Sequence, residues 1–158
     1  MDEIIRMVES LDGVRTQRAQ RGDGSPEIAW GDTFFFYAPD AEVPHAAQPF
    51  ATIVTKDYPG DASSRLDRPG VFRVNMAAGK EAFVLHTGRD PHDIETQPNP
   101  EAPAPDALDA VFAHPVYGSL GWLSVVSPGP RTSEVTRQLL ERAHELAKAR
   151  YQRRRSAG

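Results

Sequence analysis

A histidine and two aromatic residues lie close together in the last third of the chain, at His114, Tyr117 and Trp122. An imidazole that titrates near neutral pH can act as a general acid or base, and the two rings could line a pocket beside it. This pattern predicts one of two roles. Either His114 acts on an organic substrate in a pocket, or its ring only forms a hydrogen bond with a backbone carbonyl where a preceding helix ends.

Four polar residues mark a second candidate site. Lys56 and Asp57 follow an apolar, β-branched run, and Arg73 and Asn75 alternate with apolar residues in another expected strand. If the two strands are neighbours, these side chains could form a polar site for an anion on the outward face of the sheet. The alternative is a surface ion pair that braces the strand ends.

The remaining motifs favour no particular chemistry. His86 and His92 flank Asp90 and Asp93, but they lie in a proline-rich segment that we expect to be a solvated loop. Gly22-Asp23-Gly24-Ser25 lacks the spacing of a phosphate-binding loop. The chain has no cysteine, which excludes disulfides and thiolate metal ligands. We therefore expect no metal and no cofactor, and whether the protein is an enzyme stays open.

Composition predicts one soluble domain over residues 1–158 of the chain. The N-terminus does not resemble a signal peptide and no apolar run approaches about 20 residues, so we expect a cytoplasmic protein without a membrane contact.

The net charge of -4 is unevenly distributed. From Arg131 to Gly158 eight Lys and Arg face three Glu, which gives +5, so the first 130 residues carry -9. No Lys or Arg lies between Asp90 and Pro130. The C-terminal segment ends in a basic tail, residues 151–158.

An aromatic stretch, residues 27–37, is expected to organise the fold. Two apolar runs flank Gly31-Asp32, a pair suited to the two-residue loop of a β-hairpin. Alternation of side chains in such a hairpin places Trp30 and Phe35 on one face, which we expect to be buried. Further strands are expected over residues 14–18, 50–56, 72–76 and 122–126.

Helices are predicted on either side of these strands. Helical spacing indicates an amphipathic helix over residues 2–11, a short helix over 79–87, a helical turn over 106–112 and a long helix from 132 to about 154. Residues 88–105 contain five prolines and are expected to form a long loop, either a lid or a disordered segment. The sequence thus predicts an α+β fold, with an antiparallel sheet built on the aromatic hairpin and the helices packed on it.

The order of these motifs resembles that of the MmcQ/YjbR-like family. The resemblance rests on residues 29–32, 49–54, 72–80 and 121–125. It is closest to an uncharacterised bacterial branch of unknown function whose members share Lys56-Asp57-Tyr58-Pro59 and residues 66–73. The resemblance implies an α+β fold with an antiparallel sheet and packed helices, sometimes described as DNA-binding-like on fold grounds.

Three function classes remain open. The favoured one is a noncatalytic binding or regulatory module for a small molecule or a protein. The second is a small enzyme acting on an organic substrate near His114 and Trp122. The third is weak, nonspecific nucleic-acid binding through the basic tail, with Arg150, Arg153, Arg154 and Arg155 as contacts.

Any binding to duplex DNA is expected to be weak and to depend on the tail. Four arginines neutralise about four phosphates, which predicts a slope of about -3.6 for log K against log salt concentration. A chain ending at Ala149 should lose this binding and keep its fold. Filter binding across a salt series measures the slope, and sequence-selective submicromolar binding by the shortened chain would contradict the prediction.

Overall fold

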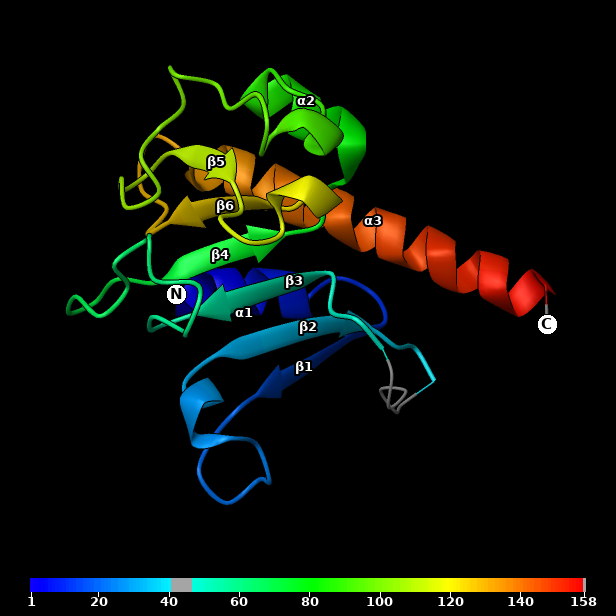
Figure 1. Cartoon of the computed structure of the whole chain (residues 1–158). Coiled ribbons are helices and arrows are strands. Elements are labelled where there is room, and N and C mark those ends of the chain that lie inside the picture. Colours follow the sequence, from blue (N-terminus) through cyan, green and yellow to red (C-terminus); the bar gives the residue numbers. More distant parts are fainter. Residues whose placement is uncertain (41–46, 158) are drawn as a thin grey trace.

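A computed structural model describes residues 1–40 and 47–157, and these form six strands in one antiparallel sheet together with three α-helices (Figure 1). The strand order is β1-β2-β3-β4-β6-β5. The strands are β1 (Val14–Arg18), β2 (Thr33–Tyr37), β3 (Ala51–Val54), β4 (Arg73–Met76), β5 (Val111–Ala113) and β6 (Leu123–Val126). The helices are α1 (Asp2–Glu9), α2 (Gly79–Thr87) and α3 (Ser133–Ala157). The predicted α+β class is confirmed.

The predicted hairpin at Gly31-Asp32 is wrong. Residues Glu27–Ala29 form a 3-10 helix, η1, and β2 pairs with β1 in the register Arg18↔Thr33. Gly31 has a φ of 92° and donates its N–H to the carbonyl of Ala19, so the chain turns before a second strand can form. The Asp32 carboxylate accepts hydrogen bonds from the backbone and hydroxyl of Thr55, which anchors this turn to the end of β3.

One face of the sheet carries the main core. Side chains alternate along a strand, so the register places the same-face residues of neighbouring strands in rows. One row consists of Phe35, Ala51, Met76 and Leu123. The next row on the same face consists of Ile53, Val74 and Val125. The helices α1 and α3 lie behind the sheet in the view of Figure 1, and they cover these rows with Ile5, Val8, Leu139, Leu140 and Ala143. All of these side chains are buried.

The predicted long C-terminal helix is confirmed. Its buried face includes Leu139, Leu140, Ala143, His144 and Ala147. The carboxylate of Asp109 fixes the entry to the helix, because it accepts hydrogen bonds from the N–H groups of residues 129, 131 and 132. Hydrogen bonds to this carboxylate outweigh the effect of burial and lower the pKa of Asp109 to about 2.

The predicted helical turn over residues 106–112 is wrong, because residues 106–110 form an irregular turn and a strand begins at Val111. Asp109 has a φ of 56°, which breaks a helix, and its side chain is committed to the start of α3. Leu108 bridges Val126, and Val111–Ala113 pairs with β6 as the edge strand β5.

The proline-rich loop, residues 88–105, includes a 3-10 turn, η2 (Pro91–Asp93), capped by the side chain of Asp90. Pro91 is buried and Ile94 packs against the main core. The side chain of Asn99 donates to the carbonyl of Thr87, which ties the middle of the loop to the end of α2. The loop thus packs on the domain along its first half. Within the described residues, no helix combines the length and the apolar character needed to cross a membrane.

Replacing Phe35 with Ala should lower the free energy of unfolding by about 3 to 5 kcal/mol, because Phe35 is fully buried at the centre of the core face. Trp30 follows η1 and is only half-buried. Its replacement with Ala should therefore cost only about 1 kcal/mol. Urea unfolding of both variants measures the difference, and equal losses would show that the region of Trp30 belongs to the core.

Candidate functional site

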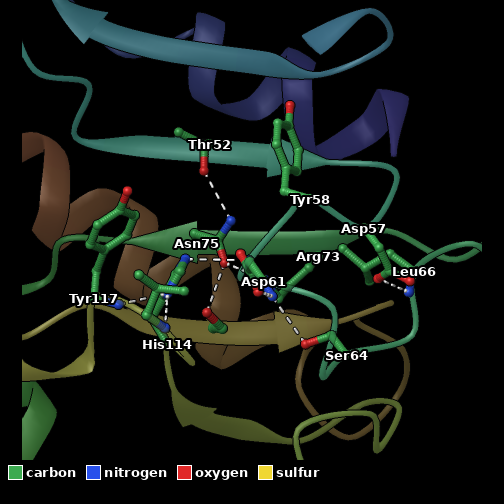
Figure 2. Close-up of polar contacts among 12 residues, drawn as sticks. Thr52, Asp57, Tyr58, Asp61, Ser64, Leu66, Arg73, Asn75, His114 and Tyr117 are labelled. Atoms are coloured by element: carbon green, nitrogen blue, oxygen red, sulfur yellow. Dashed lines mark hydrogen bonds and ion pairs between the residues drawn. The ribbon is translucent and has the colours of Figure 1, made fainter. Parts of the chain in front are cut away.

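The second face of the sheet buries polar groups instead of exposing them. Arg73 and Asn75 were expected to point outward into solvent, but the side chains of both residues are buried. The segment of residues 55–70 folds over this face and covers them (Figure 2). A small apolar cluster of Val54, Leu66, Phe112 and Val126 closes the same face beside them.

The guanidinium of Arg73 is the centre of this buried network, and the residue is 1% exposed. Asp61 pairs with it through both carboxylate oxygens, at 3.0 Å from Nη1 and 2.6 Å from Nη2. Nη1 also donates to the hydroxyl of Ser64 at 3.0 Å, and Nε donates to Asn75 Oδ1 at 2.8 Å. A buried cation is tolerated only when it is paired and hydrogen-bonded in this way.

A polar row crosses three strands next to this ion pair. Thr52, Asn75 and Ser124 face one another in the register of β3, β4 and β6. Asn75 Nδ2 donates to Thr52 Oγ1 at 3.0 Å, and Ser124 Oγ donates to Asn75 Oδ1 at 2.7 Å. Asn75 therefore joins the row to Arg73, and the side chains of the row are hydrogen-bonded to one another.

Two aspartates hold the covering segment in shape. Asp57 Oδ1 accepts the N–H of Leu66 at 2.8 Å, and Asp67 Oδ1 accepts the N–H of Asp57 at 3.0 Å. Arg68 donates to the carbonyls of residues 64 and 65. The Lys56–Pro59 and 66–73 motifs thus build the loop that carries Asp61 and Ser64 to Arg73.

Another carboxylate, that of the fully buried Asp32, anchors the start of this segment. It accepts hydrogen bonds from Thr55 and from the hydroxyl of Tyr58. Lys56 Nζ lies 3.4 Å from Asp32 Oδ1, which is an ion-pair distance without hydrogen-bond geometry. Burial, together with the hydrogen bond and charge of Asp32, raises the pKa of Tyr58. Lys56 therefore lies beside Asp32 and is not part of the network around Arg73.

The ring of His114 is held from both sides. Nδ1 accepts the backbone N–H groups of Val116 and Tyr117, both at 3.0 Å, so the proton of a neutral ring must sit on Nε2. Nε2 lies 3.3 Å from Arg73 Nη2, and since both atoms then carry hydrogens this approach is a contact and not a hydrogen bond. The expected bond to a backbone carbonyl is replaced by two bonds from backbone N–H groups.

Electrostatics keep this histidine neutral. Burial, followed by the charge of Arg73, lowers the pKa of His114 to about 3, and the charge of Asp61 only partly opposes this shift. Protonation of Nδ1 would also place its new N–H opposite the two backbone N–H groups that now donate to this atom, which disfavours the charged ring. A general base needs a pKa near the working pH, so His114 is poorly suited to proton transfer.

The aromatic grouping expected around His114 is present. The ring centroids of His114 and Tyr117 are 4.9 Å apart, and those of Tyr117 and Trp122 are 6.4 Å apart. Tyr117 is 50% exposed, while Trp122 is half-buried. A hollow of about 260 Å³ lies beside this turn, between Ile94, Glu95 and Val116.

The structure brings together only part of the predicted site. Arg73 contacts His114 and donates a hydrogen bond to Asn75, and Tyr117 and Trp122 pack around the histidine. Lys56 and Asp57 belong to the covering segment and make contacts of their own. The anion site predicted from these residues does not form here, because the cation of Arg73 is neutralised by Asp61.

Sequence reasoning missed the residues that complete the network, which are Thr52, Asp61, Ser64 and Ser124. A usable signal exists for two of them, because Thr52 and Ser124 are polar residues at the centre of otherwise apolar strands. Asp61 and Ser64 lie in an irregular segment whose path depends on long-range contacts, and their spacing carries no signal.

The basic tail lies at the far end of α3, which extends beyond the sheet in Figure 1. Arg155 pairs with Asp40, and Tyr151 contacts the same carboxylate. Burial, and then the charges of Arg154 and Arg153, lower the pKa of Arg150. The tail is thus partly attached to the domain, and its last residue, 158, lies outside the described residues.

Fold and site define a small α+β domain with helices on one face of its sheet and a buried ionic network on the other. The chain belongs to DUF6194, a family of unknown function, whose model matches residues 1–156. No curated protein and no solved structure matches the chain. Over residues 1–40 and 47–157, no three His, Cys, Asp or Glu side chains gather as metal ligands would.

Replacing Asp61 with Asn should lower the free energy of unfolding at pH 7 by about 3 kcal/mol, because it leaves the buried cation of Arg73 without its countercharge. Burial alone would raise the pKa of Asp61, but the hydrogen bonds and charge of Arg73 hold it below the ordinary value. The stabilisation by the native carboxylate is therefore present above about pH 4 and is lost as pH falls through the folded-state pKa.

Urea unfolding at pH 7 and at pH 2 tests this prediction. The difference between the native chain and the Asp61→Asn variant should be large at pH 7 and should shrink at pH 2. Glu9→Gln is the matched control, because Glu9 is exposed and forms no ion pair among the described residues. A difference that does not change with pH would contradict the charge-pair explanation.

Proposed function

We propose that the chain is a noncatalytic binding module whose contact surface is the turn of residues 114–122. The observation that supports this most strongly is a set of exposed apolar side chains on a turn whose backbone is fixed by its own hydrogen bonds. Leu120 is 74% exposed, and Val116 and Tyr117 are also exposed beside the half-buried Trp122. Exposed aromatic and aliphatic side chains that lie together are typical of interaction surfaces.

The backbone of this turn is fixed by several hydrogen bonds. The N–H of His114 donates to the carbonyl of Trp122, and the N–H of Gly118 donates to the carbonyl of His114. The two bonds to His114 Nδ1 add to these, and Nε2 of the same ring contacts Arg73. A preformed surface loses little conformational entropy on binding, which favours affinity.

The charge around the turn indicates the partner. The stretch of residues 90–130 has six Asp and Glu and no Lys or Arg. Asp90 pairs with Lys80 and Asp106 pairs with Arg65, whereas Asp93, Glu95 and Glu101 form no ion pair among the described residues. Glu95 lines the hollow beside Val116. The surface therefore suits a peptide segment that carries both apolar and basic side chains.

The enzyme alternative is less well supported at this place. His114 is the titratable group nearest the aromatic rings, and its low pKa and occupied Nδ1 disfavour its use as a base. Ser64 and Ser124 are buried, and their hydroxyls are engaged within the network. The resemblance to MmcQ/YjbR-like proteins stays a prediction, and a binding role does not depend on it.

Titration calorimetry with an octapeptide of alternating leucine and arginine tests the proposal. We expect binding in low salt that weakens as salt is added, because part of the attraction is electrostatic. An octapeptide of alternating leucine and glutamate should not bind. Leu120→Ala should weaken binding by about tenfold through the loss of buried apolar area.

Leu85→Ala is the matched control variant, because Leu85 is 79% exposed on α2, outside the turn. It should leave the affinity unchanged. The proposal fails if neither peptide binds, if the acidic peptide binds equally well, or if the two leucine variants behave alike.

A further inference from the structure

The last turns of α3 carry arginines that the domain does not neutralise. Residues 146–158 contain five Lys and Arg and no Asp or Glu. Two of these five side chains form ion pairs with aspartates of the domain. The other three are exposed and form no ion pair among the described residues, and they are Arg150, Arg153 and Arg154. Because like charges on one helix end repel one another, this end of α3 favours contact with an acidic surface.

An acidic surface of matching size lies beside the turn of residues 114–122. Asp93, Glu95 and Glu101 form no ion pair among the described residues, and Glu95 is exposed. Glu95 lines the same hollow as residues 118 and 119 of the turn. Leu120, at 74% exposure, follows directly in the chain. The turn thus presents a carboxylate and a protruding apolar side chain close together.

The helix end offers the complementary pair of features. A shallow hollow runs along one face of it, lined by Ala149, Gln152, Arg153, Ser156 and Ala157. Residues four positions apart share a face of a helix, so Arg153 lies between the two alanines. The short side chains leave room for a protruding apolar group, and the guanidinium beside them can pair with a carboxylate.

The two surfaces cannot meet within one copy of the chain. The last turns of α3 extend beyond the sheet, away from the turn of residues 114–122 next to β6 (Figure 1). Because α3 is one continuous helix over Ser133–Ala157, its end does not fold back onto the domain. A contact between the two surfaces therefore joins the helix end of one copy to the turn of another copy, which is a heterologous contact.

We propose that a second copy of this chain is a partner of the turn, and that the basic end of α3 is the segment that docks there. This inference rests on the proposed function of residues 114–122 and names a partner for it. Leu120 of one copy packs in the hollow of the other, where Glu95 pairs with Arg153. Duplex nucleic acid suits the helix end less well, because the first 130 residues carry a net charge of -9 and repel a polyanion.

Sedimentation velocity of the full chain tests the inference. The sedimentation coefficient should rise with chain concentration up to about 0.5 mM in about 20 mM NaCl, and should fall to that of one copy in about 500 mM NaCl, because salt screens the attraction. Arg153→Glu should weaken self-association by about tenfold, and so should Glu95→Arg, since each places like charges opposite one another. An equimolar mixture of the two variants should associate like the native chain, because opposite charges then meet again.

Arg21→Glu and Glu9→Arg are the matched control variants. Both residues are exposed, form no ion pair among the described residues and undergo the same changes of charge. They should leave self-association unchanged. The inference is overturned if the native chain stays monomeric, if the controls behave like the test variants, or if the mixture stays monomeric. Binding of duplex DNA by a native chain that does not self-associate would assign the helix end to nucleic acid and would also overturn it.

Titration with the leucine-arginine octapeptide separates this inference from the proposed function. Arg153→Glu should bind the octapeptide as the native chain does, because its turn is unchanged, whereas Glu95→Arg should bind it less tightly. A native chain that binds the octapeptide but does not self-associate overturns the partner named here and leaves the peptide surface in place. A chain that does neither overturns both.

Discussion

The structure depends on one constraint, which is that the buried charge of Arg73 must be neutralised where it lies. A guanidinium at 1% exposure cannot reach water, so a carboxylate must be brought to it. Asp61 meets this need only because residues 55–70 fold over the second face of the sheet. The aspartates at 57 and 67 shape that segment, and Asp32 anchors its start. The contact of Arg73 with His114 then couples the same charge to the turn on the far side of β6.

Much of the fold could be predicted, because it follows from local patterns. The apolar β-branched and aromatic runs became β2, β3, β4 and β6, and the periodic pattern at the C-terminus became α3. Two predictions failed where local patterns are ambiguous. The spacing of Leu108, Val111 and Phe112 suits one helical turn as well as a short edge strand, and only pairing with β6 decides between them. Gly31-Asp32 suits a hairpin loop, but the carboxylate of Asp32 is buried and accepts hydrogen bonds from Thr55 instead.

The site could be predicted only where its parts are close in sequence. His114, Tyr117 and Trp122 are near neighbours in the chain, and the structure does group their rings. The environment of Arg73 could not be predicted, because alternating polar and apolar residues look the same whether the polar face meets water or a buried network. Which one it meets depends on a segment folded back from residues 55–70, and the partner of Arg73 is twelve positions away with no periodic relation to it.

The position of α3 after all six strands in the sequence has a consequence for biosynthesis. Strands β1 to β4 follow one another in sequence and pair in that order, so they can assemble while the rest is still being made. Their apolar face, with Phe35, Ile53 and Met76, is covered in large part by α3, which is translated after all six strands. Until then the nascent sheet carries an apolar surface, and before β6 is made it also has an unpaired edge at β4. Both features attract chaperones and promote aggregation. Premature termination before α3 would therefore yield an aggregation-prone sheet with an uncovered apolar face instead of a smaller stable domain.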